Sequence, residues 1–194
     1  MGKFTKVSEN TFNEIQLEAG LLLNTFDPTG ATEVEDEDII CATTGGIDIS
    51  CKPTFTDYGE DIDNVPNNML EFKEVDGWNC AIAFTALNAS ASVLKMALCA
   101  ADVEGNKITP RNDMTAADAK DVWWVGERAD GGFVACCLKN ALATEGLNLK
   151  TTKKGKGQLS CTLTGHVSIK AQNVVPMEFY VQEGTSEAQE GESE

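Results

Sequence analysis

The segment from Thr43 to Asn68 constrains the fold more than any other part of the sequence. In its first half, apolar residues alternate with polar ones: Ile47, Ile49, Cys51 and Phe55 against Asp48, Ser50, Lys52, Thr54 and Thr56. A period of two residues predicts a β-strand with one buried and one polar side. Pro53 has no N–H for the sheet ladder, so we expect an edge position or a bulge there. The second half, residues 57–68, is an acidic loop that the pattern alone leaves open as a metal site or a contact surface.

The same period recurs along the chain and predicts a mainly β protein. We expect strands at 12–26 (with a bend or bulge at Gly20), 39–43, 78–86, 122–127, 133–138, 147–151, 158–170 and 177–181. One helix is expected at 90–101, from its apolar stripe at helical spacing, and residues 69–76 read as a helical turn or a loop. Residues 107–120 are expected to form a loop. About eight strands joined mostly by tight turns predict an antiparallel β-sandwich or barrel with one flanking helix.

The length of 194 residues is typical of a single domain. We expect an extended N-terminal arm at 1–11, the β domain at 12–183 and a disordered acidic tail at 184–194. The sequence shows no membrane-length apolar run and no signal-peptide pattern, which predicts synthesis in the cytoplasm. The seven cysteines are an odd number without a C-x-x-C motif, and we expect all of them to be reduced.

The charge balance argues against a nucleic-acid-binding protein. Thirty-one acidic residues face 15 basic ones, for a formal net charge of -16. Proteins that bind duplex DNA neutralise phosphates with Lys and Arg, and an acidic surface repels them instead. The basic run at 150–156 lacks the interleaved aromatic residues of a single-strand binder, so we interpret it as a solvated or ion-pairing hairpin.

Catalytic and metal-binding patterns are weak. The single histidine, His166, lies on a Ser/Thr-rich strand face and is expected to be an ordinary exposed residue. The acidic loop offers hard oxygen ligands at Asp57, Asp61 and Asp63, but its spacing is not that of an EF-hand. The sequence therefore predicts a protein that is not an enzyme and has no metal or cofactor.

The remaining feature of the sequence is a set of charged clusters, which lie in separate loops and in one hairpin of the predicted fold. The acidic ones are Glu35, Asp36 and Glu37 in one loop and Asp57, Glu60, Asp61 and Asp63 in the other, and the basic one is Lys150, Lys153, Lys154 and Lys156. Opposite charges on separate projections suit a head-to-tail contact between copies, which closes into rings or continues into filaments.

With these residues in view, the chain resembles the major tail proteins (tail tube proteins) of long-tailed bacteriophages and prophages, particularly those infecting Firmicutes. The matching stretches are G-G-I-D-I-S with F-T-D-Y-G-E-D-I-D-N-V-P-N-N at 45–68, W-N-C-A-I-A-F-T-A at 78–86, the run at 132–158, T-G-H-V-S-I-K-A-Q at 164–172 and V-P-M-E-F-Y-V at 175–181. Together they span most of the chain.

The resemblance implies a virion protein of the tail that polymerises as stacked hexameric rings. One sheet of each subunit would line the lumen, and loops and arms would reach neighbouring copies. Its partners would be itself, a tape-measure protein, and the tail terminator and distal tail proteins, with double-stranded DNA passing through at ejection without specific binding. We expect the acidic and basic clusters at the contacts between copies. The lumen wall is expected to include Asp48, Ser160, Thr162, Thr164 and Ser168.

Two alternatives remain from the sequence. One is the related tube of a contractile tail or secretion-type machine. The other is a monomeric calcium- or carbohydrate-binding β-sandwich module, for which calcium bound at residues 57–63 would be the decisive sign.

Overall fold

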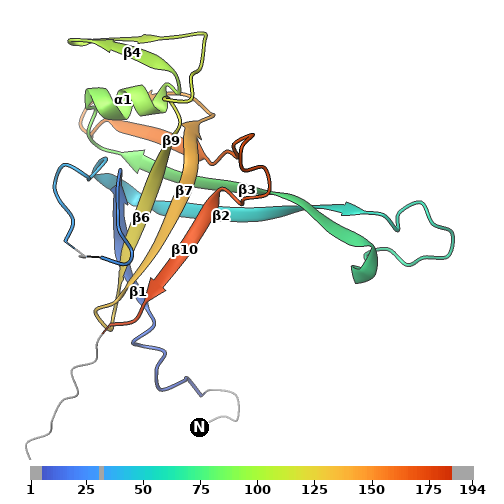
Figure 1. Ribbon diagram of the computed structural model, residues 1–194. Helices are drawn as coiled ribbons and strands as arrows, with labels where there is room; N and C mark the ends of the chain where they lie inside the picture. The colour runs from blue at the N-terminus through green and yellow to red at the C-terminus, as the bar shows by residue number, and fades with distance from the viewer. Residues whose placement is uncertain (1–5, 31–32, 185–194) are drawn as a thin grey trace, which may run out of the picture.

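The computed structural model describes residues 6–30 and 33–184 (Figure 1). Its elements in chain order are β1 (Gln16–Leu23), β2 (Thr43–Asp57), the 3-10 turn η1 (Leu70–Phe72), β3 (Lys73–Ala86), α1 (Ala91–Ala97), β4 (Ala101–Glu104), β5 (Lys107–Pro110), β6 (Lys120–Arg128), β7 (Phe133–Ala143), β8 (Asn148–Lys150), β9 (Gln158–Thr164) and β10 (Met177–Gln182). In these ranges no helix is long and apolar enough to cross a membrane.

Eight strands form one antiparallel sheet in the order β1-β6-β7-β9-β3-β2, with β10 added to β7 and β8 added to β9. This sheet has two halves, which strand β7 joins. The first part of β7 pairs with β6 and β10, whereas Leu142 and Ala143 at the end of β7 pair with β9. Figure 1 shows the β1-β6-β7-β10 half crossing the β9-β3-β2 half steeply. The predicted fold class, mainly β and antiparallel, is confirmed.

The core lies where these two halves face each other, and the alternating sides of the strands fill it. Its largest fully buried side chains include Leu22, Ile82, Leu138, Leu159, Leu163 and Val93. Helix α1 closes one end of this core through Val93 and Ala97, both fully buried. The helix therefore flanks the sheet, as its apolar stripe predicts.

Strand β1 bends at Gly20, as predicted. The pairing with β6 shifts register between Leu17 and Leu21, and Gly20 has a φ of 73°. The indole of Trp124 donates a hydrogen bond of 2.9 Å to the carbonyl of Ala19. A Cβ at Gly20 would collide with the backbone of β6 and with this indole, so both the positive φ and the close approach require glycine.

The helix is shorter than predicted. It covers Ala91–Ala97 rather than 90–101, and the Ser90 hydroxyl caps it by accepting a hydrogen bond from the N–H of Val93 at 3.3 Å. The chain leaves the helix through Cys99, whose φ of 65° is left-handed. The next residues form the β4–β5 hairpin, so β5 occupies the start of the predicted loop at 107–120.

Strand β9 ends at Thr164, and the prediction that it continues to Lys170 is wrong. The N–H of Gly165 still bonds to the carbonyl of Cys80 at 2.9 Å, and the N–H of His166 then turns to the carbonyl of Lys139 at 3.1 Å. A side chain at Gly165 would meet Leu138 and Pro176. The chain therefore leaves the sheet there and forms an exposed loop.

Other predicted elements also change. Residues 39–43 form an isolated bridge between Leu23 and Ile39, not a strand of their own. Residues 9–14 are turns, so the described part of the predicted arm at 1–11 is not fully extended. Residues 1–5 of that arm and residues 185–194 of the predicted acidic tail lie outside the described residues.

Candidate interaction surfaces

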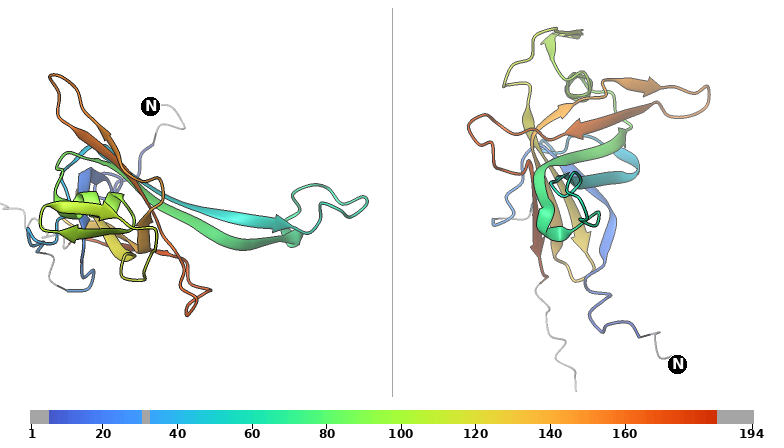
Figure 2. Two further views of the ribbon diagram at one scale, coloured as in Figure 1. Left: turned by 90° about the horizontal axis from the view of Figure 1, so that it is seen from above. Right: turned by 90° about the vertical axis from the view of Figure 1, so that its right-hand side faces the viewer.

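A long hairpin arm projects from the body of the protein. Strands β2 and β3 pair from Thr43 to Asp57 and run past the rest of the sheet (Figures 1 and 2). Cys51 and Cys80 are the last pair at the core, and Asp57 lies six positions beyond Cys51. At 3.3 Å per residue the paired arm extends about 20 Å beyond the core, before the tip loop of residues 58–72.

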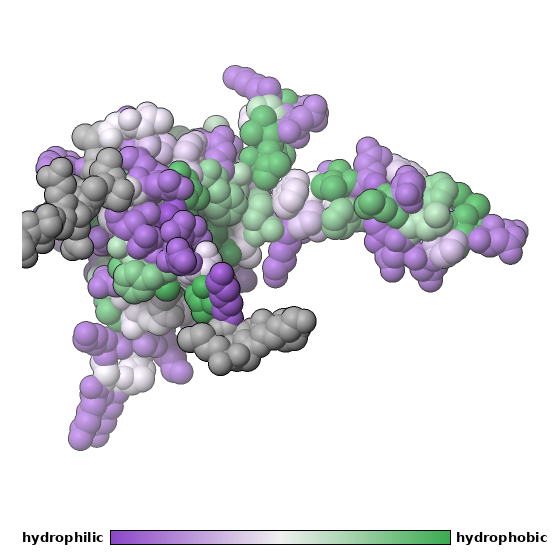
Figure 3. Space-filling model, turned by 90° about the horizontal axis from the view of Figure 1, so that it is seen from below, coloured by the Kyte–Doolittle hydropathy of each residue, from purple (hydrophilic) through white to green (hydrophobic). Residues whose placement is uncertain are grey.

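The arm exposes apolar side chains along its length (Figure 3). They are Phe55 (54% exposed), Tyr58 (60%), Ile62 (46%), Leu70 (81%), Val75 (47%) and Trp78 (40%). Exposed apolar side chains gathered on one projection are typical of a surface that contacts another macromolecule.

The tip loop is an ordered structure. The Asp57 carboxylate accepts a hydrogen bond from the N–H of Gly59 at 3.0 Å, and the N–H of Tyr58 donates to the carbonyl of Phe72 at 2.9 Å. The Asp57 carboxylate is therefore already engaged in a hydrogen bond within the loop. Glu60, Asp61 and Asp63, by contrast, are exposed and form an acidic tip.

The predicted basic hairpin is present at a different projection. Strands β8 and β9 pair around the turn at residues 151–157, and Lys150, Lys153, Lys154 and Lys156 are all exposed. Leu147 and Leu149 beside them are 40% and 48% exposed. Figure 2 shows this hairpin and the arm pointing in different directions, so the two predicted clusters do not meet within one copy.

The first acidic cluster lies in the loop between β1 and β2. Glu35, Asp36 and Glu37 are exposed, whereas Asp38 is half-buried and accepts a hydrogen bond from the Thr25 hydroxyl. The same loop covers one side of the sheet, because Phe26 packs edge-on against Trp123 and Phe133 with centroid distances of 5.7 and 5.3 Å.

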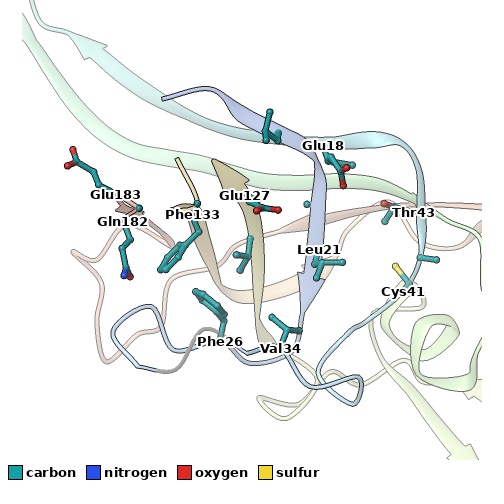
Figure 4. A pocket seen from close by; sticks show the side chains of 18 residues that line it. Glu18, Leu21, Phe26, Val34, Cys41, Thr43, Glu127, Phe133, Gln182 and Glu183 are labelled. Carbon is teal, nitrogen blue, oxygen red and sulfur yellow. The ribbon is translucent and has the colours of Figure 1, made fainter. Parts of the chain in front are cut away.

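An open groove of about 860 Å³ lies beside this loop (Figure 4). Leu21, Phe26 and Phe133 contribute apolar surface, and Figure 4 shows the two phenylalanine side chains beside each other on one side of the groove. Glu18, Glu127 and Glu183 add three carboxylates, and the described residues that line the groove include no basic side chain. Neighbouring β10 exposes Phe179 (56%) and Val181 (64%) at the sheet edge.

The outer side of β2, β3 and β9 is a polar sheet face built of short side chains. Its cross-strand rows are Asp48–Ala83–Thr162, Ser50–Ala81–Thr164 and Thr85–Ser160. Hydrogen bonds fix the hydroxyls at the border of this face. Thr162 donates to the Glu145 carboxylate at 2.9 Å, and the hydroxyls of Thr144 and Thr164 lie 2.9 Å apart.

Four of the five residues predicted to share a lumen-facing side thus lie on one surface. Ser168 does not, because the chain has left the sheet by then, and its hydroxyl accepts a hydrogen bond from the N–H of Lys170. Two lysines point to the same side of the sheet as the polar sheet face: Lys52, which pairs with Asn79, and Lys150, which pairs with Gln158. That side of the sheet therefore carries both positive and negative charges.

The strongest ion-pair cluster has a structural role. Arg111 contacts Asp102 of β4 at 2.9 Å and Asp118 at 2.6 Å, which ties the β4–β5 hairpin to the following loop. Hydrogen bonds from the N–H and hydroxyl of Thr115, with the Arg111 guanidinium, hold the pKa of Asp118 below its usual value. Its environment is that of a fixed anion, not of a general acid.

The histidine and the most deeply buried cysteines lie in structural environments. His166 is half-buried rather than exposed, and its Nδ1 lies 3.3 Å from the carbonyl oxygen of Asn140. Burial raises the pKa of Cys136 and Cys161 to about 12, which leaves their thiols protonated at neutral pH. No group of three or more His, Cys, Asp or Glu in the described ranges could hold a metal ion.

Sequence reasoning missed the arm itself. It placed residues 69–76 in a turn or loop, whereas β3 begins at Lys73 and pairs with the end of β2. The available signal was the pair of aromatic residues Phe55 and Trp78 flanking one loop, at positions that a long hairpin places near each other.

Solved structures that are similar to this chain at low sequence identity include two gene transfer agent particles. One is the virion of a native gene transfer agent particle, with 11% identity and a TM-score of 0.40 over 77% of this chain and 92% of that chain. The other is the tail of an empty gene transfer agent particle with C6 symmetry, with 10% identity and a TM-score of 0.39 over the same shares. No family model and no curated protein sequence matches the chain.

Proposed function

We propose that this chain is the structural, non-enzymatic subunit of a bacteriophage tail tube. In this proposal it assembles as hexameric rings, the rings stack into a tube, and double-stranded DNA passes through the lumen. The proposal rests on the family resemblance of residues 45–181 and on the surfaces of the subunit.

The observation that carries the proposal is the arm. Its apolar side chains are solvent-exposed in a single copy, and its length of about 20 Å beyond the core is enough to reach an adjacent protein of the same size. Burying exposed Phe, Leu and Trp side chains contributes about 25 cal/mol per Å² of apolar surface removed from water. An arm of this kind is stabilised when it packs on another subunit.

Charge supports a heterologous contact between identical copies. The acidic tip of one copy carries Glu60, Asp61 and Asp63, and the basic hairpin of another carries Lys153, Lys154 and Lys156. Two complementary surfaces on different parts of one molecule generate rings or filaments, because each copy offers both halves of the contact. The exposed edge of β10 and the acidic groove provide further surface for neighbours.

The polar sheet face suits a conduit wall. Its short side chains leave a smooth surface, which carries the acidic Asp48 and has the acidic Glu145 at its border. A wall rich in Lys and Arg would hold DNA by counterion release, whereas an acidic or neutral wall repels phosphates within a Debye length of about 8 Å at physiological salt. In this arrangement DNA passes without specific binding.

The assembled tube would require a tape-measure protein to set its length, with tail terminator and distal tail proteins at its ends. The protein would be made in the cytoplasm of the bacterial host and function in the virion tail. The tube of a contractile tail or secretion-type machine is the alternative, and a sheath partner would distinguish it.

Electron microscopy of the purified protein tests the proposal. We expect stacked rings or tubes in negative stain at high protein concentration, and species of at least ring size by light scattering. A protein that stays monomeric over the whole accessible concentration range, with no rings or tubes on the grids, would contradict the proposal.

A further inference from the structure

Two cysteine sulfurs meet at the base of the arm. Cys51 of β2 lies directly opposite Cys80 of β3, and their Sγ atoms are 3.1 Å apart. The backbone carbonyl of Cys80 accepts a hydrogen bond from Gly165, on the opposite side of β3 from β2. In an antiparallel strand the N–H and C=O of one residue point the same way, so Cys51 and Cys80 form a non-hydrogen-bonded pair.

This position fits a disulfide without movement of the backbone. Non-hydrogen-bonded pairs place their Cα atoms about 4.5 Å apart, within the range of about 4.4–6.8 Å that disulfides span. The two thiols already point at each other, because their sulfurs are in contact. Cys136 and Cys137 lack this relationship, since they are neighbours in β7 whose side chains lie on opposite faces.

We propose that Cys51 and Cys80 are an oxidation site, which a small disulfide oxidant such as glutathione disulfide converts into an intramolecular disulfide at the base of the arm. The inference does not depend on tube assembly. It concerns a covalent modification of the single subunit, and it adds to a chain whose seven cysteines are all free thiols in the structure.

The accessibility of the two thiols sets the order of the steps. Cys51 is half-buried and can be reached from solvent, whereas Cys80 is fully buried. The Cys51 thiolate attacks glutathione disulfide, which gives a mixed disulfide and releases one glutathione thiolate. The Cys80 thiolate then attacks the Cys51 sulfur and releases the second glutathione. Two protein thiols lose two protons and two electrons, and one glutathione disulfide becomes two glutathione molecules.

The second step is expected to limit the rate. Burial, reinforced by the neighbouring Cys51, raises the pKa of Cys80 to about 12, so its thiolate is scarce at neutral pH. Closure should therefore be slow at pH 7 and faster at pH 8.5. The short distance between the sulfurs partly offsets the low thiolate fraction of Cys80, because the mixed disulfide at Cys51 forms next to the Cys80 sulfur that attacks it.

The bond would close a loop that contains the entire arm. Residues 52–79 lie between the two cysteines, so the disulfide ties β2 to β3 at the point where both strands leave the core. Loops of this length restrict the unfolded chain substantially, and the oxidised protein should melt at least about 5 °C above the reduced protein. In the oxidising medium outside a cell, the bond would form and persist.

Peptide mapping of the full-length protein tests the site. The reduced protein is freed of reductant, incubated with glutathione disulfide at pH 8.5, unfolded, alkylated and digested. We expect one peptide pair linked through Cys51 and Cys80, and a rise in melting temperature that dithiothreitol reverses. Two thiols that both alkylate after oxidation, a mixed disulfide that persists at Cys51, or a bond to another cysteine would each overturn the proposal.

Matched variants complete the experiment. Cys51→Ser should form no linked peptide and show no oxidant-dependent rise in melting temperature. Cys99→Ser removes another half-buried cysteine, at the end of α1, and should behave as the unaltered protein does. The mapping of the unaltered protein needs no variant, so poor folding of Cys51→Ser would leave the test intact.

Discussion

Asp48 of β2 and Thr162 of β9 both pair with Ala83 of β3, so their side chains stand in one row across the polar sheet face. The central residue of the row is alanine, and nothing larger separates the carboxylate from the hydroxyl. This row is the best place to test whether the polar sheet face lines a lumen.

We expect Asp48→Lys tubes to retain duplex DNA. The substitution replaces a carboxylate by an ammonium in every subunit, and a cationic wall gains affinity for phosphate through counterion release. Co-sedimentation of tubes with short DNA duplexes should show binding that weakens steeply with added salt. Asp113→Lys, at a side chain 81% exposed near the β4–β5 hairpin, is the control. Equal DNA retention by the two variants would remove the polar sheet face as the wall.

Reversing the charge of the basic hairpin should prevent assembly. The variant K153E/K154E/K156E would replace the proposed attraction to the acidic tip of another copy by repulsion. All three side chains are exposed, so the melting temperature of the monomer should stay close to that of the unaltered protein. Negative-stain microscopy gives the tube yield, and K95E/K107E/K120E serves as the charge-matched control. Tubes of normal length and abundance from the hairpin variant would contradict the contact.

The fold could be predicted where each strand has one buried and one open side. Ile82 and Phe84 of β3 alternate with Ala81 and Ala83, and Leu159 of β9 alternates with Ser160, so local periodicity carries the structure. The β4–β5 hairpin gave no such signal, because its strands are only four residues long and largely exposed. Such strands have no buried face to mark them in the sequence.

The ends of elements depended on distant contacts. Val167 and Ile169 continue the alternation of β9 in the sequence, but they are 54% and 83% exposed, because the N–H of His166 bonds to the carbonyl of Lys139 and the chain leaves the sheet. The space beside Gly165, next to Leu138 and Pro176, has no room for a side chain. The candidate surfaces show the same limit. Residue types grouped the charged clusters and the polar sheet face, whereas the projection of the arm depends on where β9 stops covering β3.

Truncating Leu163 should destabilise the protein far more than truncating Ile169. Leu163 is fully buried between the halves of the sheet, and removing such a side chain costs about 2–5 kcal/mol because a cavity remains. Ile169→Ala should change the free energy of unfolding by less than about 0.5 kcal/mol. Urea denaturation of both variants measures the difference. Similar losses would mean that β9 extends beyond Thr164.

The Arg111–Asp118 pair should make stability depend on acid pH. The pKa of Asp118 is held below that of an unfolded chain, chiefly by Thr115 and then by Arg111, so the ionised carboxylate stabilises the fold at neutral pH. This contribution is complete above the unfolded pKa of 3.8 and is lost as the pH falls through the lower folded value. Thermal denaturation should thus show Asp118→Asn destabilised at pH 7, with the difference shrinking below about pH 4. Asp113→Asn, whose carboxylate lies 4.0 Å from Arg111, should show little effect at any pH.

Removing the arm should separate folding from assembly. Joining Lys52 to Asn79 through an Asn-Gly turn keeps the register, because these two residues are directly paired. They alternate with the non-hydrogen-bonded pair Cys51–Cys80 and so form a hydrogen-bonded pair, which a two-residue turn can close. The deleted segment holds exposed side chains such as Phe55 and Leu70 rather than core residues, so the shortened protein should keep its cooperative unfolding transition.

The same variant should form no tubes, since it lacks the surface that we propose contacts the neighbouring copy. Phe55→Ser with Leu70→Ser keeps the arm at full length and should also lower the tube yield, because both side chains would be buried at the contact. Val103→Ser with Met114→Ser removes exposed apolar surface elsewhere, at residues 41% and 61% exposed, and should leave the yield unchanged. A full yield from the shortened protein would show that the exposed apolar side chains of the arm do not hold the copies together.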